Sequence, residues 1–441
     1  MNLARLSYSP AYPAFLLLYG MIPALAWAHF FGISWQRPMT IAFYTALLVW
    51  SLFVVWRSRR LLLPPVIIDV LFFVFVLVIL VSLASQGDFW GGAGKHYEYF
   101  LPFMVVTPYL CGRVMRDGDI AHLARVVICA GWGVLPFILL DRMVSPSMGS
   151  TRWPVFGHDH AASLVGSLLA GAVLALLVRG AALRKQGERP VYRLLDYALI
   201  GIVTSTLVWT LARGWLLATL AGLVVLAVGD CWQCGLRGVY LRYVCYVAAV
   251  MMLSIAVLPR PSGQFYADLL TAPTEPSAPA PAPAPAPAPV DHLVGPILGE
   301  ASCLPLTQNV NSVAIRWVLY REAVAMFMQS PIWGVGASRF GERSCTGPGW
   351  YPHSTVLQAF SELGVIGGGT LLGLLWLTAR TLMRHSVVEA GLAYPVAGSF
   401  ALALFSAFFV SDQFRGNYFM ATGMCLMFGI AAGLSAQGKG K

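Results

Sequence analysis

Long apolar runs alternate with short polar segments along most of the chain. Runs of about 18 residues or more recur from end to end, which is the length that an α-helix needs to cross the hydrocarbon core of a bilayer. The pattern therefore predicts an all-α polytopic membrane protein. It indicates twelve membrane-spanning helices, at residues 12–33, 39–56, 63–85, 97–112, 119–141, 159–178, 194–211, 215–229, 239–258, 353–379, 387–410 and 417–435.

The division of the apolar stretch 194–229 into two helices depends on Arg213. A single helix of that length would rise about 54 Å at about 1.5 Å per residue, well beyond a hydrocarbon thickness of about 30 Å. Arg213 and the glycine after it form the polar interruption. We therefore expect one helix to end and the next to begin there.

Composition agrees with a membrane protein and argues against a soluble protein and a nucleic-acid-binding protein. The chain is 58% hydrophobic and only 11% charged, too few charges to cover a soluble protein of this size. The first apolar segment lacks a cleavage site flanked by small residues, so we expect a retained helix and not a signal peptide. The net charge of +10 does not indicate nucleic-acid binding, because the basic residues form short clusters between the apolar runs.

The distribution of these basic residues predicts the orientation. With twelve spans both termini lie on one side of the membrane. The loops on that side hold the larger basic clusters, at 57–60, 113–116, 179–193, 237–242, 380–384 and 439–441. The short loops on the other side hold only Arg37, Lys95, Arg142, Arg152, Arg213 and Arg415. The positive-inside rule then places both termini in the cytoplasm.

This topology divides the chain into three parts. Residues 1–258 hold the first nine transmembrane helices, 259–352 form one long loop on the non-cytoplasmic face, and 353–441 hold the last three helices and a short cytoplasmic tail. Within the loop, the Ala-Pro repeat at 273–290 cannot sustain an α-helix and favours extended polyproline II. We interpret it as a stiff spacer or a disordered tether.

A helix is predicted in the same loop at about 311–329. Four of its residues recur at helical spacing and share one face: Arg316, Tyr320, Ala323 and Phe327. That face suits a helix lying on the membrane surface with its arginine directed at a lipid phosphate. A packed loop helix with a salt-bridged arginine is the alternative.

The loop also contains two cysteines, Cys303 and Cys345, on either side of this helix. If the loop is periplasmic, both thiols can be oxidised. We therefore expect a disulfide that ties the two halves of the loop together.

Three polar residues from separate stretches fall on the same predicted membrane face: Arg213, Arg316 and His353. A guanidinium is always charged and offers a planar fork of donors suited to phosphate, although an interfacial arginine can also reach up to lipid headgroups. His353 is expected in the first turn of a helix, where the helix N-terminus lowers its pKa and keeps the ring neutral, as a base must be. Together they suggest a site that handles a phosphate-bearing lipid and moves a proton.

Other polar residues near this face add little to the prediction of a lipid-phosphate site. Arg142 and Arg152 can also meet an anionic headgroup. The His158–Asp159–His160 stretch does not favour a metal site, since positions i and i+2 of a helix do not face each other. We expect no metal ligands and no cofactor, and no nucleotide-binding glycine motif is present in the sequence.

These motifs resemble those of the O-antigen ligase and polymerase superfamily. The similarity is carried by Ala212-Arg213-Gly214, by Arg316, Trp317, Ala323, Phe327, Pro331, Gly334, Gly336 and Phe340, and by His353, Leu357, Gln358, Glu362, Gly364 and Gly367. The chain departs from the family at Ser354, where asparagine is usual, and at Ala212, where serine is often found. The sixth span also opens with His-Asp-His in place of an Asn-Pro-Asn-like turn.

The resemblance implies a GT-C-type inverting glycosyltransferase that needs no metal, in the bacterial inner membrane. The donor would be a glycan on undecaprenyl pyrophosphate, and the acceptor a sugar hydroxyl of lipid A-core. His353 would act as general base, while Arg213 and Arg316 would bind the pyrophosphate. Further substrate contacts are expected from Arg142, Arg152, Tyr320 and Gln358.

Three alternatives stay open from the sequence. An O-antigen polymerase and a protein O-oligosaccharyltransferase of the same superfamily would share the fold and the donor, and would differ in the acceptor. A lipid or glycan transporter fits the number of spans, but it predicts functional polar residues near the middle of the bilayer. The glycan, the acceptor sugar and the oligomeric state are not indicated by the sequence.

Overall fold

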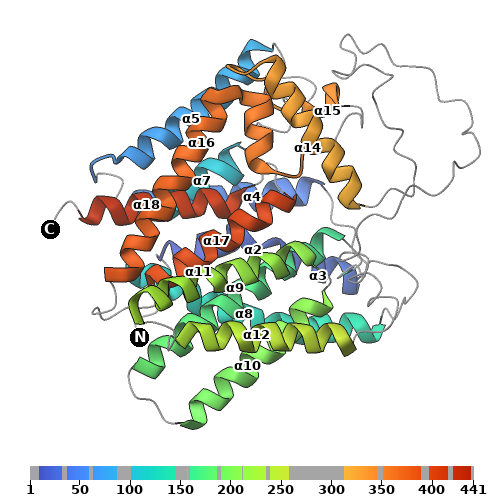
Figure 1. Cartoon of the computed structure of the whole chain (residues 1–441), viewed down its shortest axis with the longest axis vertical. Helices are drawn as coiled ribbons and strands as arrows, with labels where there is room; N and C mark the ends of the chain where they lie inside the picture. Colours follow the sequence, from blue (N-terminus) through green and yellow to red (C-terminus); the bar gives the residue numbers. More distant parts are fainter. Residues whose placement is uncertain are drawn as a thin grey trace, which may run out of the picture.

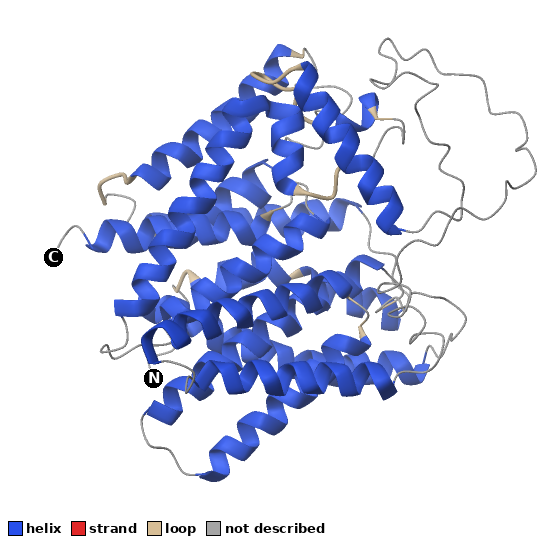
Figure 2. Ribbon diagram, in the orientation of Figure 1, coloured by secondary structure: helices blue, strands red, loops and turns tan. Residues whose placement is uncertain are grey.

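The computed structural model describes residues 9–31, 37–58, 63–86, 101–144, 156, 159–185, 190–210, 212–234, 239–257, 312–344, 351–388, 397–415 and 421–438. Every regular element within these ranges is a helix (Figure 2). The Ala-Pro tract at 273–290 and the predicted disulfide partners Cys303 and Cys345 lie outside the described residues. The fold class is therefore all-α, as the hydrophobic pattern predicts.

The first half of the described chain contains α2 (Ala11–Tyr19), α3 (Met21–Phe31), α4 (Arg37–Arg57), α5 (Ile67–Ser85), the π-helical turn η3 (Leu101–Val106), α7 (Thr107–Arg113), α8 (Asp117–Val144), α9 (Asp159–Lys185), α10 (Pro190–Trp209), α11 (Arg213–Cys234) and α12 (Val239–Val257). The second half contains α14 (Ser312–Gln329), α15 (Phe340–Arg343), α16 (Thr355–Val388), α17 (Ala397–Arg415) and α18 (Thr422–Gly438).

Helices occupy each of the twelve predicted apolar segments. Six of them are long and apolar enough to cross a membrane, or seven if the bent pair α2 and α3, which meet at 47°, forms one span. Four other apolar helices are shorter, namely α10, α11, α17 and α18 over their apolar parts. The described residues thus form a multi-pass membrane protein. The predicted break at Arg213 is confirmed, since α10 ends at Trp209 and α11 begins at Arg213.

Helix α9 is central to the lower part of the bundle, since 83% of an 18-residue apolar window within Ala161–Ala182 is buried inside the protein. Helices α8 to α12 form the lower part of the molecule in Figure 1, and α5, α14 and α16 form the upper part, with α17 and α18 between them. The most extensive contacts join α11 to α17 and α18 to α7, and α16 packs against both α5 and α17. Helix α17 is therefore the element that connects the two parts.

A buried ion pair ties α5 to α7. Asp69 accepts hydrogen bonds from Nε of Arg113 at 2.8 Å and from the hydroxyl of Tyr109 at 2.5 Å, and its other oxygen accepts the backbone N–H of Val66 at 2.7 Å. Arg113 is only 4% exposed. This arginine of the predicted cytoplasmic clusters thus neutralises a buried carboxylate, which would otherwise be costly in the protein interior.

Helices α7 and α18 approach so closely that a glycine is required between them. A Cβ atom at Gly429 would collide with the backbone oxygen of Tyr109 and the backbone nitrogen of Arg113. Without a side chain the two backbones can come together, as small residues allow between membrane helices.

We expect Gly429→Ala to lower the melting temperature of the purified protein in detergent by several degrees, because overpacking typically costs about 1–3 kcal/mol. Gly133→Ala on α8 is the matched control, since a Cβ there would meet no atom within 4 Å. Equal melting temperatures for the two variants would contradict the close approach of α7 and α18.

Candidate functional site

His353 lies in the short segment that leads into α16. Its φ of 54° is in the left-handed region, and its ring centroid lies 4.4 Å from that of Tyr351. Ser354 follows, and its hydroxyl accepts the backbone N–H of Leu357 at 3.3 Å, as in a helix cap. The prediction that places His353 in the first turn is thus wrong, because the helix begins at Thr355 and the histidine precedes its cap.

The surroundings of His353 hold its ring neutral. Burial, and secondarily the positive charge of Arg316, lower the pKa of His353 to about 4. The direction agrees with the sequence prediction, but burial contributes most and the nearby guanidinium adds to it. At pH 7 the imidazole is therefore an unprotonated base beside a fixed cation.

Arg316 reaches this site because of how α14 packs. The hydroxyl of Tyr320, one turn after Arg316, donates to the backbone oxygen of Gln413 on α17 at 3.2 Å. Two turns further on, the ring of Phe327 meets that of Phe360 on α16 edge to face at 5.4 Å. The face that carries Arg316 is therefore turned towards α16 and α17.

This packing corrects the prediction that the Arg316 face lies on the membrane surface. Ala323, in the middle of that face, is 1% exposed. The exposed apolar stripe of α14 is a separate one beside that face, with Trp317, Val324 and Met328. The arginine is thus directed into the protein, and the packed-helix alternative describes the geometry better.

The turn after α14 is held against a break in α16. Helix α16 is interrupted at Gly364, whose φ is 64° and ψ −162°. Three backbone hydrogen bonds join the two segments, from Val335 to Ser361 and Gly336 to Glu362 at 2.9 Å each, and from Val365 to Pro331 at 2.7 Å.

The glycines at this joint allow the backbone of the turn to come close to the backbone of α16. Gly334 has a φ of 70°, and a Cβ atom there would collide with the backbone of Glu362. A Cβ atom at Gly364 would likewise collide with the backbone of Ile332. The Pro-x-x-Gly-x-Gly pattern thus allows the turn to place α14 on α16.

A buried carboxylate completes this joint. Glu362, 1% exposed, accepts the backbone N–H groups of Ser338 at 2.8 Å and Phe340 at 3.3 Å. The side-chain amide of Gln358 donates to the same carboxylate at 3.3 Å. Gln358 is itself only 2% exposed, so its role as a substrate contact stays a prediction while its contact with Glu362 is observed.

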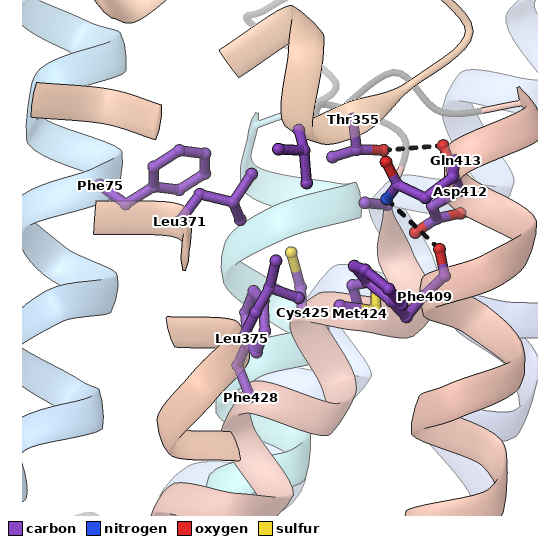
Figure 3. Close-up of a pocket in the computed structure, with 12 residues that line it drawn as sticks. Phe75, Thr355, Leu371, Leu375, Phe409, Asp412, Gln413, Met424, Cys425 and Phe428 are labelled. Carbon is purple, nitrogen blue, oxygen red and sulfur yellow. Dashed lines mark hydrogen bonds between the residues drawn. The ribbon is translucent and has the colours of Figure 1, made fainter. Parts of the chain in front are cut away.

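An apolar pocket opens next to the start of α16. Its walls come from α5, α16, α17 and α18 and include Phe75, Leu371, Phe409, Met424 and Phe428. Figure 3 shows that the polar residues Thr355, Asp412 and Gln413 gather at one end of the pocket. This polar end lies close along the chain to His353, since Thr355 is two residues after it.

The third predicted residue, Arg213, is the first residue of α11. Two residues later, the ring of Trp215 packs edge to face on Phe408 of α17 at 5.7 Å. The start of α11 thus lies at the end of α17 that carries Gln413, which is the end at which α14 and α16 meet. The side chains of Arg213 and Arg142, and the whole of Arg152, lie outside the described residues.

Sequence reasoning missed Gln413. Its side-chain oxygen accepts the hydroxyl proton of Ser354 at 2.8 Å, and its backbone oxygen accepts that of Tyr320. No short motif marks it, because its partners are 59 and 93 residues away in the sequence. The role of Gln413 becomes evident only from the packing of α17 against α14 and α16.

Six to seven candidate spans among the described residues indicate a multi-pass membrane protein. Residues 197–372 match the sequence model of the O-antigen ligase family, a range that contains Arg213, Arg316 and His353. No curated protein sequence matches the chain. The family match supports an O-antigen ligase-family protein and confirms the resemblance found in the sequence.

Members of the matched family are glycosyltransferase-like enzymes. The substrates that this family implies are a lipid-linked glycan and a lipid acceptor in a membrane.

The pKa of His353 can be checked directly. We expect the rate at which diethyl pyrocarbonate modifies His353, followed by peptide mass spectrometry, to stay constant from pH 8 down to about pH 5, because the ring remains neutral there. Arg316→Gln removes the nearby positive charge, so the midpoint should rise towards the ordinary value near 6.5 without reaching it, since burial persists. A midpoint near 6.5 in the unaltered protein would contradict the buried, cation-flanked site.

Proposed function

We propose that this protein is an O-antigen ligase. It transfers a glycan from undecaprenyl pyrophosphate to a sugar hydroxyl of lipid A-core, at the periplasmic face of the bacterial inner membrane. The proposal includes twelve spans with both termini in the cytoplasm, nine helices in 1–258, a periplasmic loop at 259–352 and three helices in 353–441. The observation that carries it is the neutral His353 beside Arg316 in the region that matches the family.

In this mechanism His353 is the general base. The acceptor hydroxyl gives its proton to a ring nitrogen of His353 while its oxygen forms a bond to the anomeric carbon of the glycan. The bond from that carbon to the pyrophosphate oxygen breaks, and its electron pair leaves with undecaprenyl pyrophosphate. Attack from the side opposite the leaving group inverts the configuration at the anomeric carbon.

The arginines act on the leaving group. Negative charge builds up on the pyrophosphate as the bond breaks, and donors already in place stabilise that charge at no cost of reorganisation. Arg316 lies near His353, and the backbone of Arg213 lies at the same end of the bundle. The two guanidinium groups would bind the pyrophosphate and neutralise its charge, which is the role that a divalent ion has in other transferases.

Donor binding would also prepare the base. A pKa near 4 makes a weak base, because general-base catalysis is best with a pKa near the working pH. A pyrophosphate bound at Arg316 would offset the positive charge and add negative charge nearby, which raises the pKa of His353. The histidine would therefore accept a proton readily only when the donor is in place.

The function is tested by glycan transfer in liposomes with purified protein, undecaprenyl-pyrophosphate glycan, lipid A-core and EDTA. We expect transfer by the unaltered protein and a loss of at least about 100-fold in His353→Ala, since general-base catalysis contributes about 10²–10⁴-fold. Arg316→Gln should also lose most activity through weaker charge stabilisation.

His385→Ala is the matched control, because His385 lies at the far end of α16 and bonds to Asp117 of α8 at 2.9 Å. It should keep its activity if it folds, as judged by its elution from a sizing column. Chain growth on the lipid-linked glycan, without transfer to lipid A-core, would instead identify an O-antigen polymerase. Transfer to a protein acceptor would identify a protein O-oligosaccharyltransferase. Full activity in His353→Ala would refute the mechanism for any acceptor.

A further inference from the structure

One residue of α17 bonds to both helical segments that carry the candidate catalytic groups. Gln413 receives the Ser354 hydroxyl on its side-chain oxygen at 2.8 Å and the Tyr320 hydroxyl on its backbone oxygen at 3.2 Å. Ser354 is the immediate neighbour of His353, and Tyr320 lies one helical turn after Arg316. The two bonds therefore connect the base and the cation through a single residue.

Gln413 is itself fixed in place. Its amide donates to the backbone oxygen of Phe409 one turn earlier in α17 at 3.4 Å, as Figure 3 shows. In the same place, the hydroxyl of Thr355 donates to the backbone oxygen of Asp412 at 3.1 Å. The Thr355 bond holds the end of α17 against the beginning of α16, and the amide bond fixes the Gln413 side chain on its own helix.

Backbone geometry explains why such a support is needed. His353 has a φ of 54°, a conformation that is costly for a residue with a side chain and persists only where the surroundings impose it. The Ser354 hydroxyl both caps α16 and bonds to Gln413, and it directly follows the strained position. Without Gln413 the cap would keep only its bond to α16.

We propose that Gln413 is a positioning residue, which holds the strained His353 segment and the Arg316 helix at a fixed separation. The inference rests on the proposed function only for its effect on catalysis. Gln413 does not touch the reacting atoms in this account. It acts through Ser354 on His353 and through Tyr320 on Arg316.

Because the charge of Arg316 lowers the pKa of His353, the protonation of His353 reports how far the two residues are apart. Arg316 and Tyr320 are on α14, and Tyr351 packs on the His353 ring. Asp412, on α17, accepts a hydrogen bond from Thr355 of α16 on its backbone oxygen. Burial raises the pKa of the Tyr320 hydroxyl, so it stays protonated and donates its hydrogen bond. Only Arg316 among them is a fixed cation, and its distance from His353 is what Gln413 would control.

The test uses Gln413→Met, which keeps the approximate size of the side chain and the backbone oxygen but removes the side-chain bonds to Ser354 and Phe409. We expect the midpoint for modification of His353 by diethyl pyrocarbonate to rise by about one pH unit, as the ring moves away from Arg316 and its buried site. In the transfer assay kcat should fall about 10- to 100-fold, with a smaller change in KM, because a misplaced base slows the chemical step.

Gln437→Met is the matched control. Gln437 is also a helix-terminal glutamine that donates to a backbone oxygen, that of Met115 at 3.1 Å, but it lies on α18. It should change neither the midpoint nor kcat. A lower melting temperature in both variants with an unaltered His353 midpoint in Gln413→Met would show a merely structural role and overturn the proposal.

Combined variants separate the two bonds. Ser354→Ala and Gln413→Met remove the same hydrogen bond, so the midpoint in the double variant should not exceed that of the larger single change. Tyr320→Phe removes the other bond, so its effect should add to that of Gln413→Met. Full additivity of Ser354→Ala with Gln413→Met would contradict the proposal.

The two readouts also separate this inference from the proposed function. A shifted midpoint in Gln413→Met, with no glycan transfer even by the unaltered protein, would support the positioning role and refute the ligase. Transfer by the unaltered protein, with an unchanged midpoint and kcat in Gln413→Met, would support the ligase and refute the positioning role.

Discussion

The backbone contact between the turn at 331–336 and the break in α16 at Gly364 determines the rest of the site. A helix interrupted in apolar surroundings leaves backbone groups without intrahelical partners, which is costly where water is scarce. The turn supplies those partners through Val335, Gly336 and Pro331. Because α14 ends only two residues before this turn, the direction of α14 is set by the same contact. The break and the turn thus require each other, and together they fix where Arg316 lies relative to α16.

From this constraint follows the electrostatic character of the site. Arg316 is turned towards the protein, close enough to His353 to lower its pKa together with burial. An apolar pocket with a polar end begins beside the same helix start. A cation beside a neutral imidazole suits an anionic group such as a phosphate. The proposed ligase reaction uses the arginine for the phosphates and the histidine for the proton.

Much of the fold can be predicted from the sequence because membrane helices satisfy their own backbone groups within each segment. Hydropathy alone therefore locates the helices, and the length of the stretch 194–229 requires the break that the structure has at Arg213. The spacing of residues in α14 correctly predicts which residues share a face. It does not predict what covers that face, since this depends on α16 and α17, which lie later in the chain.

The parts of the site that sequence reasoning missed are those made by tertiary contacts. Glu362 appears in the sequence only as one letter of a family pattern, whereas the structure shows a buried carboxylate that accepts three hydrogen bonds. Gln413 carries no local signal, because its role arises only when three distant helices meet. The left-handed backbone conformation of His353 could not be predicted from the sequence either, since histidine does not favour that conformation as glycine does.

The central claim is that a phosphate-bearing donor and His353 share one electrostatic environment through Arg316. The measurement that tests it most directly is the pH dependence of His353 modification with and without undecaprenyl pyrophosphate, each curve normalised to its own rate at high pH. The account predicts that the bound lipid moves the midpoint upwards from about 4, because an anion next to the ring favours its protonated form. It also predicts a smaller shift in Arg316→Gln, where the lipid is held less tightly. An unchanged midpoint at saturating lipid would contradict the account, since the phosphate would then bind away from the histidine.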